Sequence, residues 1–167
     1  ERYWIVFNGE IYNYLELRDE LLQLGYEFAT ESDTEVVVGL YSVYKEDVVS
    51  RLRGMFSFLI WDKHLKILFG ARDPFGIKPF YYSEQEDITY FASEEKSILA
   101  AIGIRQDLNL ESLHHYLSFQ YVPEPATMIT SIKKLPSGHY FTKKAGKQLE
   151  IKSYWKPSFP IKISEEN

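Results

Sequence analysis

Three short segments of this sequence carry side chains that could do chemistry. The first is Phe7-Asn8-Gly9-Glu10, which we expect where a strand ends and a helix begins. The side-chain amide of Asn8 and the backbone N–H of Gly9 could donate to one small anion, because glycine lets the backbone approach a ligand closely. Such a pair of donors is what an oxyanion hole needs. An Asn-Gly pair is more often a simple turn, so the residues alone leave both interpretations open.

The second segment is Ser32-Asp33-Thr34-Glu35, which predicts the start of a helix. We expect the Ser32 side chain to accept from the Glu35 N–H and the Glu35 carboxylate to bind the Ser32 N–H. The helix dipole alone favours a carboxylate such as Asp33 in the first turn. As a functional group, Asp33 could instead hold the ammonium group of a substrate.

The third segment, Ala71–Pro79, cannot form a regular element because two prolines and a glycine interrupt it. Arg72 and Asp73 could pair inside this loop and lock its conformation. We therefore predict a structural role for both residues.

The rest of the pattern predicts the elements that position these segments. Aromatic residues make up 16% of the chain, which indicates substantial β-structure. The run Met55–Trp61 is apolar on both faces, which indicates a strand covered on both sides. Ser93 is expected to cap a helix. The strands are expected at 2–7, 26–29, 55–61, 65–70, 80–82, 88–92, 139–142 and 148–155, and the helices at 11–24, 32–52, 93–101 and 110–119.

Composition and charge argue against several functional classes. The 167 residues carry a net charge of −5, which does not favour a general nucleic-acid binder. No apolar run approaches the ~20 residues that cross a bilayer, and we expect a cytoplasmic protein without a membrane partner. The four histidines share no metal-ligand spacing, so no metal site is expected. Cysteine is absent, which excludes disulfides and a cysteine nucleophile within these residues.

Taken together, the segments resemble a known family. The stretches FNGEIYNYLELRDEL, SDTEVVV, GMFSFLIWD, GARDPFGIKPFYY, FASEEKSIL and LPSGHY are similar, in this order, to the glutaminase domain of glutamine-hydrolysing asparagine synthetases. These enzymes are class II glutamine amidotransferases of the N-terminal nucleophile type. The resemblance implies an α+β fold, a four-layer α-β-β-α sandwich of antiparallel sheets of the Ntn-hydrolase type.

The resemblance also implies a mechanism. The family's nucleophile is a cysteine at the mature N-terminus, and its own α-amino group serves as the base. The thiolate attacks the side-chain amide of glutamine, ammonia leaves, and water hydrolyses the thioester to glutamate. By match to the family, Asn8 and Gly9 would form the oxyanion hole. The glutamine pocket would be lined by Asn8, Gly9, Glu10 and Asp33, with Asp33 facing the α-ammonium group.

The sequence departs from the family's pattern at its beginning. The family starts with Met-Cys-Gly, several dozen residues before the NGE segment, whereas Glu1 stands seven residues before Asn8. We therefore expect a partial amidotransferase domain over 1–155, incomplete at its N-terminus, and a linker or tail over 156–167. The expected partners are glutamine and a missing synthetase domain, which would use ATP and Mg²⁺, whereas this chain would need no cofactor. Exposed sheet edges make a homodimer possible.

Three functions stay open at this point. The first is the ammonia-supplying part of an asparagine synthetase, with this chain inactive alone. The second is a glutamine-binding or regulatory module that has no nucleophile. The third is the glutaminase part of another class II amidotransferase.

Overall fold

Two antiparallel sheets form the centre of the computed structural model, which describes residues 2–103 and 105–159. The larger sheet has the strand order β1-β2-β3-β7-β8, and the smaller has the order β5-β4-β6. The larger sheet comprises β1 (Tyr3–Ile11), β2 (Gly54–Asp62), β3 (Ile67–Arg72), β7 (His139–Lys144) and β8 (Glu150–Ser153), and the smaller comprises β4 (Tyr81–Gln85), β5 (Ile88–Ala92) and β6 (Lys133–Lys134).

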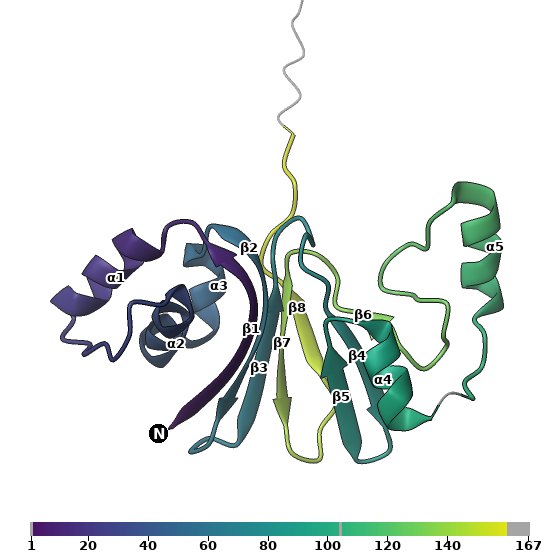
Figure 1. Cartoon of the computed structure of the whole chain (residues 1–167), viewed down its shortest axis with the longest axis horizontal. Coiled ribbons are helices and arrows are strands. Elements are labelled where there is room, and N and C mark those ends of the chain that lie inside the picture. Colours follow the sequence, from purple (N-terminus) through teal and green to yellow (C-terminus); the bar gives the residue numbers. More distant parts are fainter. Residues whose placement is uncertain (1, 104, 160–167) are drawn as a thin grey trace, which may run out of the picture.

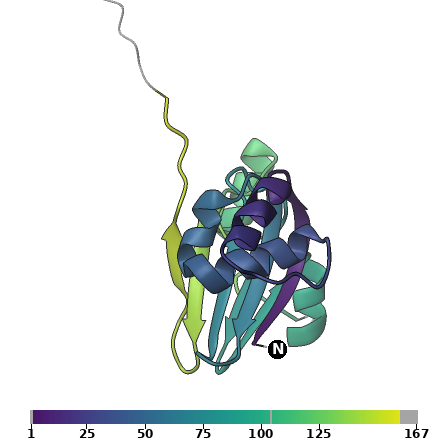
Figure 2. The same cartoon turned by 90° about the vertical axis from the view of Figure 1, so that its left-hand side faces the viewer.

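Helices cover the outer sides of the two sheets. Three of them, α1, α2 and α3, lie across the larger sheet, and α4 lies against the smaller one (Figure 1, Figure 2). The predicted four-layer α-β-β-α sandwich of antiparallel sheets is therefore confirmed. The helical segments are α1 (Tyr14–Gln23), α2 (Asp33–Tyr44), the short 3₁₀ turn η1 (Lys45–Asp47), α3 (Val48–Arg51), α4 (Glu95–Ile102) and α5 (Leu110–Phe119).

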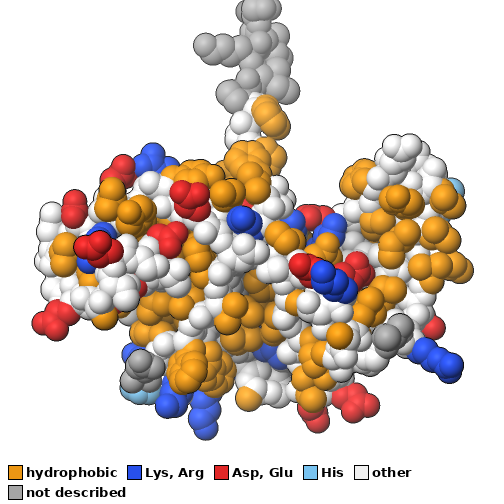
Figure 3. All heavy atoms as spheres, in the orientation of Figure 1, with side chains coloured by type: hydrophobic (Ala, Val, Ile, Leu, Met, Phe, Trp, Pro, Cys, Tyr) orange, Lys and Arg blue, Asp and Glu red, His pale blue; other side chains and the backbone are white. Residues whose placement is uncertain are grey.

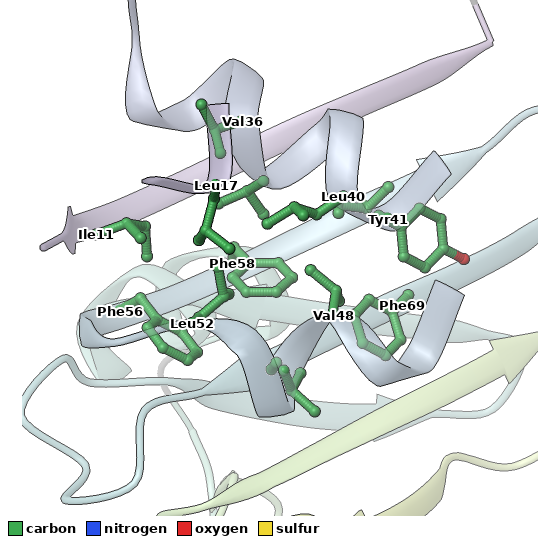
Figure 4. Close-up of a cluster of buried hydrophobic side chains, with 14 of the residues drawn as sticks. Ile11, Leu17, Val36, Leu40, Tyr41, Val48, Leu52, Phe56, Phe58 and Phe69 are labelled. Carbon is green, nitrogen blue, oxygen red and sulfur yellow. The ribbon is translucent and has the colours of Figure 1, made fainter. Parts of the chain in front are cut away.

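The main core lies between the larger sheet and its helices. Figure 4 shows Phe58 of β2 and Phe69 of β3 near Leu40 and Tyr41 of α2, and Phe56 of β2 beside Leu52, all in one buried cluster. Side chains alternate along a strand, so the residues between these phenylalanines face the other sheet. That second face is partly buried, because Leu59 packs against a smaller cluster that includes Phe80, Leu135 and Phe141, while Trp61 at its end is 37% exposed. The doubly covered strand predicted over Met55–Trp61 is therefore confirmed.

The helix predicted over 32–52 is broken after Tyr44. Lys45 has a φ of 52°, in the left-handed region that ends helices, and η1 and α3 follow as separate short pieces. The Lys45 ammonium group stabilises the break, because it donates to Ser42 O and to the Tyr3 hydroxyl, each at 2.9 Å. The spacing of apolar residues continues across this break, so the sequence pattern predicts one helix where the structure has separate pieces.

The strand predicted at 26–29 is wrong. Its last backbone N–H, on Ala29, donates to the Glu35 carboxylate at 2.8 Å, as does that of Thr30 at 2.6 Å. Glu35 therefore does not reach back to Ser32, and the Ser32 hydroxyl accepts from the Thr34 N–H instead of the Glu35 N–H. The helix start is capped, but by partners that differ from the predicted ones.

Residues 156–159, the described part of the predicted tail, have no regular secondary structure, and 160–167 lie outside the described residues. None of the helices in the described ranges is long and apolar enough to cross a membrane.

Candidate functional site

The segment Asn8-Gly9-Glu10 lies inside strand β1 and not at a helix start. Pairing with β2 continues through Ile11, and one residue further the Tyr12 N–H donates to Arg53 O at 2.7 Å. Ile11 is buried under the helical layer, which holds the end of the strand against the core. The expectation that this segment lies where a strand ends and a helix begins is therefore wrong, and the Asn-Gly pair forms no turn, because packing after Gly9 keeps the backbone extended.

The pairing pattern determines where the Gly9 N–H points. In an antiparallel pair, alternate residues exchange backbone hydrogen bonds with the neighbouring strand, and the residues between them point their N–H groups the other way. Since the Tyr12 N–H points toward Arg53, the residue before β2, the N–H groups of Ile11 and Gly9 point away from β2. β1 is the end strand of its sheet in the described part of the chain. The Gly9 N–H therefore faces the open edge of the sandwich.

A glycine is required where Gly9 lies, because β1 and β2 approach closely there. A Cβ at Gly9 would lie 2.2 Å from Met55 O, and a Cβ at Gly54 would lie 2.1 Å from Glu10 O. Both contacts involve backbone atoms, which cannot rotate away. The absence of both side chains lets the two strands stay paired beside the open edge.

Asp33 reaches the same open edge from the first turn of α2. Its carboxylate accepts from the Ile11 N–H at 3.1 Å. The Ile11 N–H and the Gly9 N–H both point to the open edge of β1, so Asp33 binds a neighbour of the Gly9 N–H on that edge. Ile11 is only two residues beyond Gly9, which places the two N–H groups about 7 Å apart along the strand. The helix start and the strand thus bring a carboxylate and an unblocked peptide donor to one edge.

Asn8 lies on the face of β1 that looks toward the smaller sheet. Its side-chain amide donates to the Ser93 hydroxyl at 3.2 Å, across the gap between the sheets. Beside this bond is a small open pocket of about 70 Å³. Its lining comes from β1, β2 and the region of β4 and β5, namely Val6, Asn8, Ser57, Phe58, Leu59, Phe80, Phe91, Ala92 and Ser93. One water needs roughly 10–15 Å³ of such space, so the pocket admits a small polar group.

The predicted site residues do not all border that pocket. Glu10 shares the face of Asn8, two residues along β1, and its side chain is exposed. Asp33 is absent from the pocket lining and meets β1 at the strand edge instead. The structure thus places Asn8 in the gap between the sheets, and Gly9 and Asp33 along the edge of the same strand.

Ser93 is a member of this site that sequence reasoning missed. It was expected to cap the helix that follows, but the N-cap position of α4 is Glu94 and carries no side-chain cap. The Ser93 hydroxyl instead accepts from the side-chain amide of Asn8, which is 85 residues away in the chain. No local spacing in the sequence signals that contact.

The loop between β3 and β4 is held by Asp73, which is completely buried. Its carboxylate accepts from the N–H groups of Phe75, Ile77 and Lys78 within the loop, at 2.9–3.1 Å. It also accepts from the Phe56 N–H at 3.3 Å, and Phe56 is the residue opposite Gly9 in β2. The loop is thereby fixed to the strand that supports the candidate site.

Arg72 does not pair with Asp73 as expected; its ion pair is with Glu124, at 2.6 Å. The guanidinium group also donates to the carbonyl oxygens of Lys78, Gly76 and Leu135, at 2.7–2.8 Å. Behind the loop, the Tyr154 hydroxyl donates to Arg72 O at 2.7 Å. Burial raises the pKa of that phenol, and the nearby Asp73 charge raises it further, so Tyr154 stays a donor.

Comparisons with known proteins show which family the sequence belongs to. A family model described as a glutamine amidotransferase domain matches residues 1–155. The chain is 51% identical over 169 residues to a Bacillus subtilis protein named asparagine synthetase [glutamine-hydrolyzing] 1, a match that covers 99% of this chain and 26% of that protein. It is 47% identical over 142 residues to a putative asparagine synthetase [glutamine-hydrolyzing] of Mycobacterium bovis, covering 83% of this chain and 22% of the relative.

The fold has solved counterparts as well. The structure titled as the allosteric regulatory enzyme of purine biosynthesis superposes with a TM-score of 0.67 at 20% identity, covering 93% of this chain and 29% of that one. At that identity the likeness shows the fold alone. The chain spans about a quarter of the length of the curated relatives that it matches. The match over nearly the whole chain shows that it belongs to the glutamine amidotransferase domain family.

Proposed function

We propose that this chain is the glutamine-hydrolysing, ammonia-supplying part of an asparagine synthetase. The observation that carries the proposal is the shared edge of β1, where the Gly9 N–H points outward and Asp33 binds the neighbouring Ile11 N–H. The relatives named above are glutamine-hydrolysing asparagine synthetases, and they match over this part of their length.

The proposed roles follow from what glutamine offers to such an edge. An extended glutamine has its carboxamide at one end and its α-ammonium group at the other. The carboxamide oxygen would accept from the Gly9 N–H and from the Asn8 amide, and it gains negative charge when the carbonyl carbon is attacked. The α-ammonium group would bind the carboxylate of Asp33, with exposed Glu10 nearby to favour a cation.

The attacking thiol is proposed to come from polypeptide outside these 167 residues, since they contain no cysteine. Attack on the carboxamide carbon would form a thioester and release ammonia, and water would then release glutamate. This chain would hold the substrate and stabilise the oxyanion in both steps. Without the thiol we expect it to bind glutamine and not to hydrolyse it.

The complete reaction is proposed to use aspartate, ATP and Mg²⁺ in the part of the relatives that this chain does not cover. Residues 2–103 and 105–159 contain no group of three or more histidine, cysteine, aspartate or glutamate side chains arranged to hold a metal ion.

The test uses the full-length gene product and separates glutamine use from synthesis. Replacing Asn8 by Ala should lower glutamine hydrolysis by about 10²–10³-fold, the usual loss for one oxyanion donor. Asparagine formation from free ammonia should stay intact, because the synthetase part is untouched. Near-normal glutamine turnover would refute the role of Asn8.

A second pair of variants tests the ammonium site. Asp33→Asn should raise the KM for glutamine by roughly tenfold or more, since a charged hydrogen bond contributes about 1.5–3 kcal/mol. The matched control is Asp19→Asn, which removes an exposed carboxylate of α1. Equal KM values for the two variants would argue against substrate binding by Asp33.

A further inference from the structure

The small pocket beside Asn8 contains a polar side chain, that of Ser57, which the proposed roles do not use. Hydrophobic side chains gather along the junction of the two sheets on the face seen in Figure 3. The pocket lies between the sheets, and most of its lining is apolar, including Phe80 and Phe91. Its polar side chains are those of Asn8, Ser57 and Ser93. A small polar molecule in the pocket therefore has three side chains to bind.

The strand register places Ser57 opposite Asn8. The two residues pair directly across β1 and β2, so their side chains leave the sheet on the same face. Directly opposite residues have Cβ atoms about 4.5–5.5 Å apart, a separation that one water molecule can bridge. Ser57 is only 5% exposed. Within residues 2–103 and 105–159 its hydroxyl has no hydrogen-bond partner, so it is available to a molecule in the pocket that it lines.

The pocket meets the requirements for an ordered water. Its volume of about 70 Å³ exceeds the roughly 10–15 Å³ that one water needs, and such a site also needs about two to four polar partners. A water there would donate to the Asn8 side-chain oxygen and to the Ser57 hydroxyl. It would accept from the Ser93 O–H, because the Ser93 oxygen is the acceptor in its bond with the Asn8 amide and keeps its own hydrogen. One lone pair of the water then stays free to attack.

We infer that this pocket binds the water that hydrolyses the thioester, and that Ser57 positions this water. The inference rests on the proposed function, in which a thiol outside these residues forms a thioester with glutamine. The carbonyl oxygen of that thioester would accept from the Asn8 amide and from the Gly9 N–H. The carbonyl carbon is bonded to this oxygen, and a water positioned for attack lies about 3–3.5 Å from the carbon. The attacking water therefore needs a site beside Asn8.

The hydrolytic step balances with water as the only added reactant. The water oxygen forms a bond to the carbonyl carbon, and the bond between that carbon and sulfur breaks. One water hydrogen leaves as a proton to the base that activates the thiol, and from there it reaches the departing sulfur. The products are glutamate and the restored thiol. Ser57 acts through the water, so it is a positioning residue for this step and has no part in the first attack on the carboxamide.

The experiment uses the full-length gene product with glutamine and hydroxylamine, in the absence of aspartate and ATP. Hydroxylamine competes with water for the thioester, so the products are γ-glutamyl hydroxamate and glutamate, and their ratio is measured at one hydroxylamine concentration. Ser57→Ala removes the hydroxyl and Ser57→Thr keeps it. Ser112→Ala is the matched control, because Ser112 is 1% exposed and its hydroxyl also has no partner among the described residues.

Hydrolysis of the thioester should be about fivefold slower in Ser57→Ala, because one hydrogen bond that orients the water is lost. Hydroxylamine attacks through a nitrogen that is more nucleophilic than water and depends less on orientation. The ratio of hydroxamate to glutamate should therefore rise about fivefold, whereas Ser57→Thr and Ser112→Ala should keep the ratio of the unchanged protein. The ratio reports the fate of each thioester, so a smaller folded fraction would lower both products alike and leave it unchanged.

The other outcomes are distinguishable. A ratio in Ser57→Ala equal to that of the unchanged protein would overturn the inference, whether or not total turnover falls. An equal rise in Ser57→Ala and Ser57→Thr would overturn it as well, since threonine keeps the hydroxyl. Slower ammonia release in the first turnover of Ser57→Ala would also count against it, because Ser57 would then act before the thioester exists. An unchanged full-length protein that forms neither product from glutamine would instead refute the proposed function.

Discussion

The Asn8 side-chain amide donates to the Ser93 hydroxyl at 3.2 Å, and this bond joins β1 of the larger sheet to the residue that follows β5 of the smaller one. A primary amide has two donor hydrogens. Ser93 can therefore accept one of them while the other remains for a ligand. The bond fixes the rotation of the amide, and it gives Ser93 the function of a positioning residue in the proposed oxyanion hole.

Replacing Ser93 by Ala should lower kcat for glutamine hydrolysis in the full-length protein by about fivefold, with little change in KM. The reason is that the lost bond contributes about 1 kcal/mol to orienting a donor that acts mainly in the transition state. Ser93→Thr should restore most of the rate because it keeps the hydroxyl. The control is Ser97→Ala, at an exposed residue of α4. Equal kcat values for the Ser93→Ala and Ser97→Ala variants would contradict the positioning role.

Gly9→Ala should lower the free energy of unfolding of the 167-residue chain by roughly 3 kcal/mol, because the new methyl group must displace backbone atoms of β2. Urea denaturation measures the loss. The control is Gly146→Ala, where a Cβ meets nothing within 4 Å and only the positive φ of 70° opposes it. That control should lose about 1 kcal/mol. A smaller loss at Gly9 than at Gly146 would show that the two strands can move apart.

Much of the fold follows from local pattern. The residues of β2 alternate between two apolar environments, and that alternation alone indicates a strand covered on both sides. The helices over 93–101 and 110–119 also lie where apolar spacing predicts them, within a few residues. These features are predictable because each depends on neighbours a few positions away.

The failures involve residues whose hydrogen-bond partners differ from those that the local motif specifies, some of them nearby in the chain and some far from it. Glu35 had one candidate donor by spacing, the Ser32 N–H, but the folded chain offers it the Ala29 and Thr30 N–H groups as well. Lys45 ends α2 because Tyr3, 42 residues away, accepts its ammonium group. No window of local sequence contains such a partner.

The candidate site shows the same limit. Asn8 and Gly9 could be singled out by type, but their presence inside a strand depends on the packing of Ile11 under α1 and α2. The approach of Asp33 to the Ile11 N–H likewise needs the helix to lie against the strand. The types of these residues therefore indicated the chemistry of the site. Their positions depend on how the sheet and the helices pack together.

Asp62 should make the stability of the chain fall at low pH. Its side chain is completely buried and accepts two hydrogen bonds from Arg2, at 2.7 and 3.1 Å. The Arg2 guanidinium holds the pKa of that carboxyl at about 2, below its ordinary value of 3.8. Since the folded pKa is depressed, the contribution is complete above about pH 4 and is lost as the pH falls toward 2. The linked stabilisation is roughly 2 kcal/mol.

The check for Asp62 compares the urea midpoints of the unchanged chain and of Asp62→Asn from pH 5 to pH 2. The unchanged chain should be the more stable one at pH 5, and the difference should shrink as the pH falls through the window. Asp87→Asn, at an exposed carboxylate, should keep the steep pH dependence of the unchanged chain. A constant difference between Asp62→Asn and the unchanged chain at every pH would contradict the assignment.

Asp73→Asn should be the most destabilising of the carboxylate changes, although it replaces one oxygen by a nitrogen of the same size. The two carboxylate oxygens accept from four backbone N–H groups, those of Phe56, Phe75, Ile77 and Lys78. An amide offers one oxygen as an acceptor, so its NH₂ group would face two of these donors. Leaving buried donors without a partner costs about 1–3 kcal/mol each, and we expect a loss of roughly 3 kcal/mol in urea denaturation. Asp87→Asn should lose less than about 0.5 kcal/mol, as surface changes usually do. If the two variants unfold at the same urea concentration, the loop is held by the Arg72 contacts and not by the Asp73 carboxylate.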